Sequence, residues 1–352
     1  INNERQARAD MVDMNGDGLE DFVEIVRTSE HGTNKDLEYI NTGPKQDLLS
    51  KIQYWQGGSA SITYKTAVQY TDDSGKPVNK SPYPIFTVNQ ISTSDGLGNS
   101  MTSSYKYEGG HYYYSSPTDK QFTGYDLVTE TNSSVITKTY YHTANESETT
   151  HGEYNDDYFK IGKPYRVEKH DNSGRLYQVV VNKWDSNDLG GGSKFVKLAQ
   201  TADLTYDTYA THRDKAESYT YDNTNGNVTQ KMEWGEVFAN NDGTFSDTGN
   251  DKQTTNYTYT TSSPNLVAVA EKLDQNGTRV SQQKIYYDNQ SLQSAVKGNV
   301  TKIESWVTGP TYVNTQKSYT PFGLVATETD PRGNITTYSY DAYSLYPTLV
   351  VN

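Results

Sequence analysis

Short runs of alternating apolar and polar residues, each ending at turn residues, make up much of the chain. Residues 22–26 read FVEIV, and pairs of tyrosines two residues apart recur downstream. Successive side chains of a strand point to opposite faces of a sheet, so both tyrosines of a pair lie on one face. Helical periodicity never lasts beyond two turns, and the pattern predicts an all-β protein. The pairs are Tyr105 and Tyr107, Tyr219 and Tyr221, Tyr257 and Tyr259, and Tyr338 and Tyr340.

Three segments share one template, which is a strand, a D-x-x-G turn, a returning strand and an aromatic residue near Asp. They are residues 167–185, 270–288 and 326–341. The aspartate of such a turn caps backbone amides, and the glycine supplies a positive φ at its end. A G-N-[VI]-T signature recurs at 226–229, 298–301 and 333–336. Recurring hairpins predict a repeat-built β architecture rather than one compact sandwich. The predicted turn residues are Asp171, Gly174, Asp274, Gly277, Asp330 and Gly333.

The composition indicates an ordered, acidic protein. Among 352 residues there are 31 tyrosines, and this wealth of aromatic side chains separates the chain from disordered sequences. The formal net charge of −13 argues against nucleic-acid and anionic-membrane partners, and no apolar run approaches the length of a membrane span. Cysteine is absent, which excludes a disulfide scaffold, a cysteine–zinc site and a cysteine nucleophile.

The sharpest local motif is an acidic loop at residues 13–21, which read DMNGDGLED. Oxygen ligands at every second position, with glycines at the bends, wrap a short loop around a hard cation such as Ca²⁺. The alternative is an Asp/Asn/Gly turn that binds nothing. We expect a structural calcium site here. Its ligands would be the side chains of Asp13, Asn15, Asp17 and Asp21 and the carbonyl oxygen of Leu19.

The sequence singles out no catalytic group. It contains no G-x-S-x-G elbow, no H-E-x-x-H motif and no phosphate-binding Walker loop. The six histidines share no metal-ligand spacing, and His142 and His151 are too loosely placed to argue for zinc. A hydrolase on a β scaffold would need a convergent acid pair, which nothing in the sequence marks out. We therefore expect that the protein is not an enzyme.

Tyrosine has two possible roles. Cross-strand aromatic pairs stabilise a sheet, and the period-2 placement favours such ladders. Exposed rings can instead stack on sugars. Tyr112, Tyr113 and Tyr114 break the alternation and are the best candidates for an exposed glycan-binding patch.

The hairpins that end in Tyr and Asp resemble the YD repeats of the RHS, teneurin and toxin-complex B families. Residues 47–65 resemble the region that follows the propeller in toxin-complex B and SpvB-like proteins, and residues 121–125 are similar to its F-x-G-F element. The acidic loop, which leads into a strand, resembles the FG-GAP or VCBS blade loop of β-propellers, where calcium is structural. The order of these features is also that of the family.

This resemblance implies a spiral YD-repeat β-hairpin shell preceded by the end of an FG-GAP-type propeller blade. It divides the chain into the propeller end (1–45), the junction and first shell strands (46–130) and the YD-repeat segment (131–352). Both ends of the sequence look cut from something longer.

The function implied is that of a non-enzymatic wall section of a cage that encapsulates a toxin or effector. Expected partners are the protein's own C-terminal payload or companion toxin subunits, in a secreted or cell-surface setting. The alternative is a secreted or cell-surface adhesin whose tyrosine-rich strands bind glycans.

Overall fold

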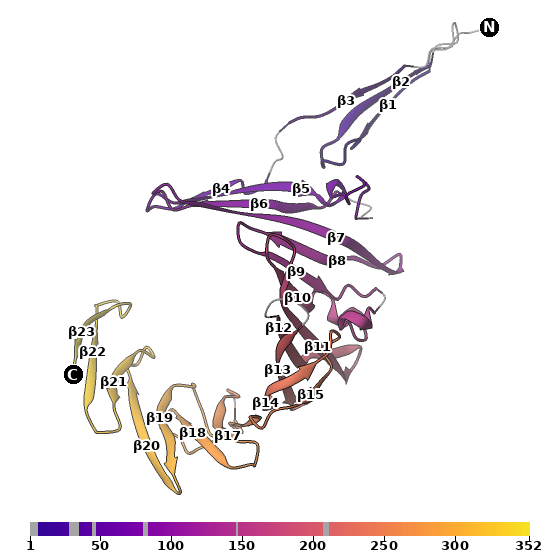
Figure 1. Cartoon of the computed structure of the whole chain (residues 1–352). Coiled ribbons are helices and arrows are strands. Elements are labelled where there is room, and N and C mark those ends of the chain that lie inside the picture. Colours follow the sequence, from indigo (N-terminus) through magenta and orange to yellow (C-terminus); the bar gives the residue numbers. More distant parts are fainter. Residues whose placement is uncertain are drawn as a thin grey trace. The chain divides into compact units, whose positions relative to one another are not determined.

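The computed structural model describes residues 6–27, 35–43, 47–79, 84–145, 147–206, 211–262 and 264–352. In these residues the chain consists of antiparallel strands joined by turns, with three short 3-10 helices and no α-helix (Figure 1). The predicted all-β fold class is confirmed. None of the helices in this part of the chain is long and apolar enough to span a membrane. The three helices are η1 (Ala67–Gln69), η2 (Thr149–His151) and η3 (Tyr158–Lys160).

The chain divides into two compact units. Unit 1 comprises Ile1–Trp184 and Thr205–His212, and unit 2 comprises Asp185–Leu204 and Arg213–Asn352. The boundaries expected at 45/46 and 130/131 are a different division, which follows the family resemblance, and they stay predictions.

Unit 1 begins with a three-stranded antiparallel sheet in the order β1-β2-β3. A second antiparallel series runs from β4 to β11, in which β7 and β8 form a long hairpin. That β1–β3 are the end of a propeller blade stays a prediction. The strands are β1 (Gln6–Val12), β2 (Asp21–Arg27), β3 (Lys35–Tyr39), β4 (Lys51–Gln53), β5 (Ser59–Thr66), β6 (Phe86–Ser94), β7 (Ser100–Ser116), β8 (Asp119–Thr131), β9 (Ile136–Tyr141), β10 (Pro164–His170) and β11 (Leu176–Gly190), which ends in unit 2.

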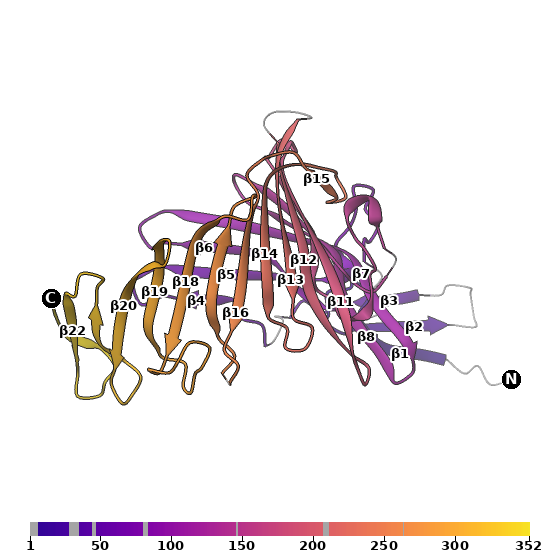
Figure 2. The same ribbon diagram turned by 90° about the horizontal axis from the view of Figure 1, so that it is seen from below.

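Unit 2 is a series of hairpins in which successive strands pair antiparallel from β13 to β23, and β14 pairs with both β15 and β16 (Figure 2). The strands are β12 (Ser193–Tyr206), β13 (His212–Tyr221), β14 (Val228–Ala239), β15 (Phe245–Asp247), β16 (Gln253–Tyr259), β17 (Val267–Leu273), β18 (Arg279–Tyr287), β19 (Val300–Thr308), β20 (Thr311–Tyr319), β21 (Val325–Thr329), β22 (Ile335–Tyr340) and β23 (Pro347–Val351).

One hydrogen bond recurs through unit 2. The tyrosine that ends a strand donates its hydroxyl proton to a backbone carbonyl oxygen of an earlier strand, and in four of the five bonds this acceptor is the first residue of that strand. At each of these tyrosines the register of the strand pairing shifts, as it does at a β-bulge. The bonds are Tyr221 to Leu198 (2.8 Å), Tyr259 to Val228 (2.9 Å), Tyr287 to Val267 (2.7 Å), Tyr319 to Val300 (2.8 Å) and Tyr340 to Val325 (2.8 Å).

The D-x-x-G turns share one geometry. In the turn at 274–277, the Asp274 carboxylate accepts from the backbone N–H groups of Asn276 (2.9 Å) and Thr278 (2.8 Å), and Gly277 has a φ of 77°. Asp171 and Asp330 accept from the corresponding two amides of their own turns, and Gly174 and Gly333 have φ values of 85° and 91°. Each turn therefore satisfies its own backbone locally.

The hydrophobic core is thin. Among the described residues fourteen hydrophobic side chains are buried, and seven of these are alanines. Most strand positions are only half-buried, since few residues cover either face of a strand. Much of the order of the sheets therefore comes from backbone ladders, turns and tyrosine hydroxyls rather than from a packed interior.

Candidate functional site

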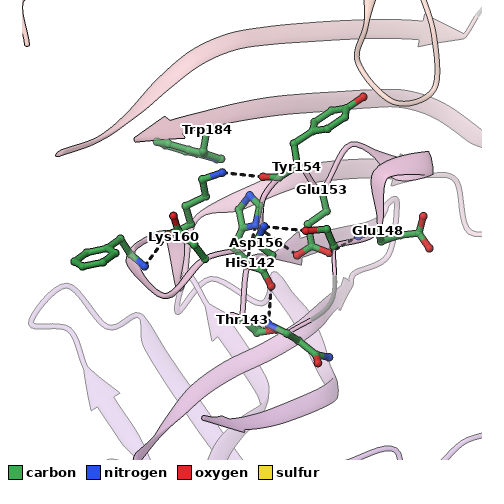
Figure 3. Close-up of polar contacts among 12 residues, drawn as sticks. His142, Thr143, Glu148, Glu153, Tyr154, Asp156, Lys160 and Trp184 are labelled. Atoms are coloured by element: carbon green, nitrogen blue, oxygen red, sulfur yellow. Dashed lines mark hydrogen bonds and ion pairs between the residues drawn. The ribbon is translucent and has the colours of Figure 1, made fainter. Parts of the chain in front are cut away.

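The connection between β9 and β10, residues 142–163, encloses a group of polar side chains that are almost completely buried. His142 and Thr143 are each 1% exposed, Glu153 is 6% exposed and Lys160 is 2% exposed. Buried polar groups are costly unless they are paired. This segment is therefore organised around specific polar contacts, which Figure 3 shows.

Two carboxylates converge on one nitrogen of His142. The Nδ1 atom lies 3.0 Å from Oδ1 of Asp156 and 3.5 Å from Oε1 of Glu153 (Figure 3). Each of the three side chains offers one ligand atom, and these atoms lie within 4.8 Å of one another. In the part of the chain that the structure describes, it is the only such group of three His, Cys, Asp or Glu side chains.

The surrounding backbone orients these side chains. The other oxygen of Asp156, Oδ2, accepts from the N–H of Asn145 at 2.8 Å. The other oxygen of Glu153, Oε2, accepts from the N–H of Glu148 at 3.0 Å. His142 continues the pairing of β9 with β10, because its N–H donates to the carbonyl oxygen of Lys163 at 3.0 Å. Both carboxylates therefore turn a second, separate oxygen toward the imidazole.

A cavity of about 150 Å³ adjoins this group and is lined by polar side chains, including Asp126, Thr143, Glu148, Glu153 and Tyr165. The hydroxyl of Thr143 donates to Oδ1 of Asp126 at 2.6 Å. Tyr165, which also lines the cavity, is 5% exposed. The cavity wall is therefore rich in oxygen-bearing side chains.

The electrostatics of the group follow from burial and pairing. Burial lowers the pKa of His142, but the hydrogen bonds and charges of Asp156 and Glu153 outweigh it and raise the pKa above its ordinary value. Burial raises the pKa of Asp156, but the hydrogen bonds from His142 and Asn145 bring it below its ordinary value. Burial raises the pKa of Asp126 despite the bond from Thr143. The imidazole of His142 and the carboxylate of Asp156 therefore favour their charged forms.

The aromatic and basic residues beside the group close one side of it. The ammonium group of Lys160 donates to the carbonyl oxygen of Tyr154 at 2.7 Å. The indole N–H of Trp184 donates to the carbonyl oxygen of Pro164 at 2.9 Å, and the ammonium group of Lys163 lies 5.2 Å from the centre of the Trp184 ring. These contacts join the connection to β10 and β11.

Sequence reasoning missed this group. It weighed His142 only together with His151 and found the two too loosely placed to argue for zinc. In the structure His151 is half exposed and lies 3.7 Å from Glu148. Glu146, the other acidic residue between the histidines, lies outside the described residues. The partners of His142 come 11 and 14 residues later in an irregular segment, where no fixed ligand spacing marks them.

The acidic loop at 13–21 is a series of side chain-to-amide bonds. The carboxylate of Asp13 accepts from the N–H groups of Asp17 (3.0 Å) and Gly18 (2.8 Å). Oδ1 of Asn15 accepts from the N–H of Asp17, and Oδ1 of Asp17 accepts from that of Leu19, both at 2.9 Å. Side-chain oxygens that a calcium ion would use thus cap the loop itself, and the calcium site stays a prediction.

Asp21 ties this loop to its surroundings. Its fully buried carboxylate accepts from the N–H of Asn41 at 2.7 Å and from that of Met14 at 2.8 Å, and the bond from Asn41 lowers its pKa. The hydroxyl of Thr66, at the end of β5, donates to the carbonyl oxygen of Gly16. The loop therefore contacts β5, which lies in the region expected to be the junction.

The three adjacent tyrosines of β7 differ in exposure. A register shift between His111 and Tyr112 interrupts the pairing with β8. Tyr112 is half-buried, Tyr113 packs on Tyr158 with ring centres 5.1 Å apart, and Tyr114 is 62% exposed. Only Tyr114 offers a largely open ring, and glycan binding at this place stays a prediction.

A hollow of about 560 Å³ in unit 2 includes Asp288 in its wall. The carboxylate of Asp288 accepts four backbone N–H groups, from residues 296–299, at 2.7–3.0 Å. Because these amides occupy both oxygens, the hollow has a structural carboxylate rather than a free acid.

Comparisons with known proteins extend this picture. Residues 3–153 match the family model described as the insecticide toxin TcdB middle/N-terminal region. Three crystal structures match 98% of this chain at 12% identity: TcdB2-TccC3 without its hypervariable C-terminal region (TM-score 0.68), TcdB2-TccC3-Cdc42 (0.66) and TcdB2-TccC3-TEV (0.65). The match covers 25% of each of those chains, so this chain spans about a quarter of their length. No curated protein matches the chain.

The resemblance to toxin-complex B proteins expected from the sequence is confirmed by both comparisons. The family model covers the acidic loop, the expected junction and most of the buried connection. The crystal structures extend the likeness of fold to nearly the whole chain, including its large antiparallel sheet.

Proposed function

From this resemblance to toxin-complex B proteins, we propose that the chain is a structural section of a β-shell that encloses a toxic payload. In this proposal its role is structural and non-enzymatic. The observation that carries the proposal is the likeness of fold over 98% of the chain to TcdB2-TccC3 structures. The partners we propose are a payload at the protein's own C-terminus or a companion toxin subunit, and the setting is secreted or at the cell surface.

The side chains of unit 2 support a wall of this kind. Lys231 on β14 lies 2.9 Å from Glu217 on β13, and Lys272 on β17 lies 2.9 Å from Glu233 on β14. Charged and tyrosine side chains therefore follow one another across the strands. A wall with such a surface offers an enclosed chain few apolar contacts, so it can hold the chain without giving it a core to fold around.

The test is electron microscopy of the full protein that carries this chain, prepared with its payload, together with limited proteolysis. We expect a hollow particle in which the payload resists protease until the shell is opened. A solid particle, or a payload digested as fast inside as when free, would contradict the proposal.

The glycan-binding adhesin is the second candidate, and the exposed ring of Tyr114 beside the Tyr113–Tyr158 pair is the observation that favours it. A glycan array distinguishes the two functions. Selective binding by the chain that is lost in Tyr114→Ala and kept in Tyr343→Ala, which removes a ring 83% exposed elsewhere, would support the adhesin. Equal signals from both variants would show that Tyr114 does not bind the glycan.

A further inference from the structure

We propose that His142, Glu153 and Asp156 form a binding site for a divalent transition metal, and that Zn²⁺ fits the donor set best. The site lies in the connection between β9 and β10. It is independent of the calcium loop and does not depend on the proposed wall function.

The two distances from His142 to the carboxylates are those of a coordination sphere, and all three donor atoms lie within 4.8 Å of one another. A tetrahedral zinc ion with bonds of about 2.0–2.1 Å separates its ligand atoms by about 3.3 Å. The distances from Nδ1 of His142 are 3.0 Å to Asp156 and 3.5 Å to Glu153, which bracket this value. A cation at this place would replace the proton that His142 shares with the carboxylates, and small side-chain movements would be enough.

The charge of the group also calls for a cation. One imidazole, that of His142, faces the carboxylates of Glu153 and Asp156. Burial raises the pKa of Asp126, and the charges of these two carboxylates raise it further, whereas His111 acts in the opposite direction. Uncompensated buried charge is costly, and buried carboxylates are usually paired or bound to metal. A divalent ion balances the two carboxylates that bind it.

The ligands are held in place from behind. The second oxygens of Asp156 and Glu153 accept backbone N–H groups from Asn145 and Glu148. Outer hydrogen bonds of this kind orient metal ligands and reduce the entropy that is lost on binding. The arrangement leaves one oxygen of each carboxylate beside the imidazole nitrogen.

The cavity beside Glu153 provides the remaining position. Thr143, Glu148 and the 5% exposed Tyr165 also line this cavity, so its wall is polar. Three protein ligands and a space that admits water are the usual form of an open zinc site. Water in the cavity would complete the coordination.

The donor types select the class of metal. Imidazole nitrogen with carboxylate oxygen suits zinc and neighbouring transition metals, whereas calcium takes six to eight oxygen ligands and magnesium keeps most of its water. Zinc bound here would join the end of β9 to the loop that carries Glu153 and Asp156, and would therefore stabilise the whole connection.

The experiment uses the full 352-residue chain without a histidine tag, treated with a chelator and then titrated with ZnCl₂ in a calorimeter. We expect saturable binding of one Zn²⁺ per chain. Titration with Co²⁺ should produce the visible absorption bands of a tetrahedral site, and Zn²⁺ should abolish these bands. Absence of one-to-one binding by the parent chain would overturn the proposal.

Glu153→Gln is the principal variant, because glutamine keeps the size of the side chain and removes the charge. We expect it to bind Zn²⁺ about 10-fold more weakly or worse, by analogy with the loss of other metal-site groups. His151→Asn is the matched control, since it removes the exposed imidazole of the same connection, and it should bind as the parent does. Binding by Glu153→Gln within twofold of the parent, or loss in His151→Asn alone, would assign the metal to another place.

Discussion

At the scale of single residues, hydrogen bonds of polar side chains stabilise this protein where other proteins depend on a larger hydrophobic core. Asp288 is the clearest example, because one carboxylate satisfies the backbone of an entire connection, residues 296–299. Tyr287 is another, because its hydroxyl bonds the end of β18 to the start of β17. Such bonds act over a few ångströms, and each can be removed by one conservative substitution.

Asp288 predicts a dependence of stability on pH. Burial alone would raise the pKa of Asp288, but its four amide donors lower it from 3.8 to about 2. A pKa that is lower in the folded state adds stability above pH 3.8, and this stability is lost as the pH falls toward 2. Asp288→Asn should therefore unfold at lower urea concentration than the parent at pH 7, by about 1 kcal/mol, and the gap should close near pH 2.

Urea unfolding curves at pH 7, 4, 3 and 2 measure this effect. Asp73→Asn, which changes an exposed aspartate of a turn in unit 1, is the control and should follow the parent at every pH. A gap between Asp288→Asn and the parent that stays constant down to pH 2 would show that the carboxylate charge is not the cause.

Tyr287 predicts a loss from removal of a single oxygen atom. It is 6% exposed, and its hydroxyl donates to the carbonyl oxygen of Val267 at 2.7 Å. Tyr287→Phe leaves that carbonyl without its donor and should lower the free energy of unfolding by about 1 kcal/mol. Tyr343→Phe, at a ring 83% exposed, should change it little. Equal thermal denaturation of the two variants would mean that the recurring tyrosine bond does not stabilise the sheet.

At the scale of elements, side chains of short loops and turns accept hydrogen bonds from the backbone N–H groups of the same loop or turn. The turn at 274–277 occupies its own amides with one carboxylate, and the acidic loop at 13–21 does the same with several side chains. The pattern that predicts a calcium loop and the pattern of a self-capped turn use the same residues. Stability measured with and without Ca²⁺ distinguishes the two.

We expect Asp17→Ala to lower the melting temperature of the chain in Ca²⁺ more than it does in a chelator. The carboxylate of Asp17 would lose both its bond to the Leu19 N–H and its place as a calcium ligand. Thermal denaturation of the parent and the variant, each with excess Ca²⁺ and with chelator, separates the two effects. An identical difference in both conditions would mean that Asp17 acts only through its hydrogen bond to the loop backbone. Equal melting temperatures of parent and variant in Ca²⁺ would contradict the calcium site.

At the scale of the whole molecule, the chain forms two compact units of antiparallel strands, and few hydrophobic side chains of the described residues are buried. Contacts between strands are mostly between neighbours in the sequence, as in repeat proteins, whose stability is close to a sum of local terms. This arrangement can be lengthened by further hairpins without the need to enlarge a core. It suits the wall function that we propose.

Calorimetry tests this organisation. Because the chain has two units with their own contacts, we expect its thermal unfolding to depart from a two-state transition. The calorimetric enthalpy should exceed the van 't Hoff enthalpy, and Tyr287→Phe should shift only the transition of unit 2. A single transition with equal enthalpies, shifted as a whole by that variant, would contradict the prediction.

The sequence by itself determined the local structure. A period of two places side chains on the faces of a strand, and the D-x-x-G spacing sets aspartate against the amides of its own turn, both over a few residues. The all-β class and the toxin-complex B resemblance follow from such patterns and their order, and both are confirmed.

Only the tertiary structure decided which distant groups meet. His142 finds Glu153 and Asp156 because an irregular connection folds back on β9, and Tyr287 finds the carbonyl oxygen of Val267 because a bulge sets the register of its strand. No periodicity records such meetings. They depend on the path of the backbone between the residues, which the packing and hydrogen bonds of the surrounding chain select.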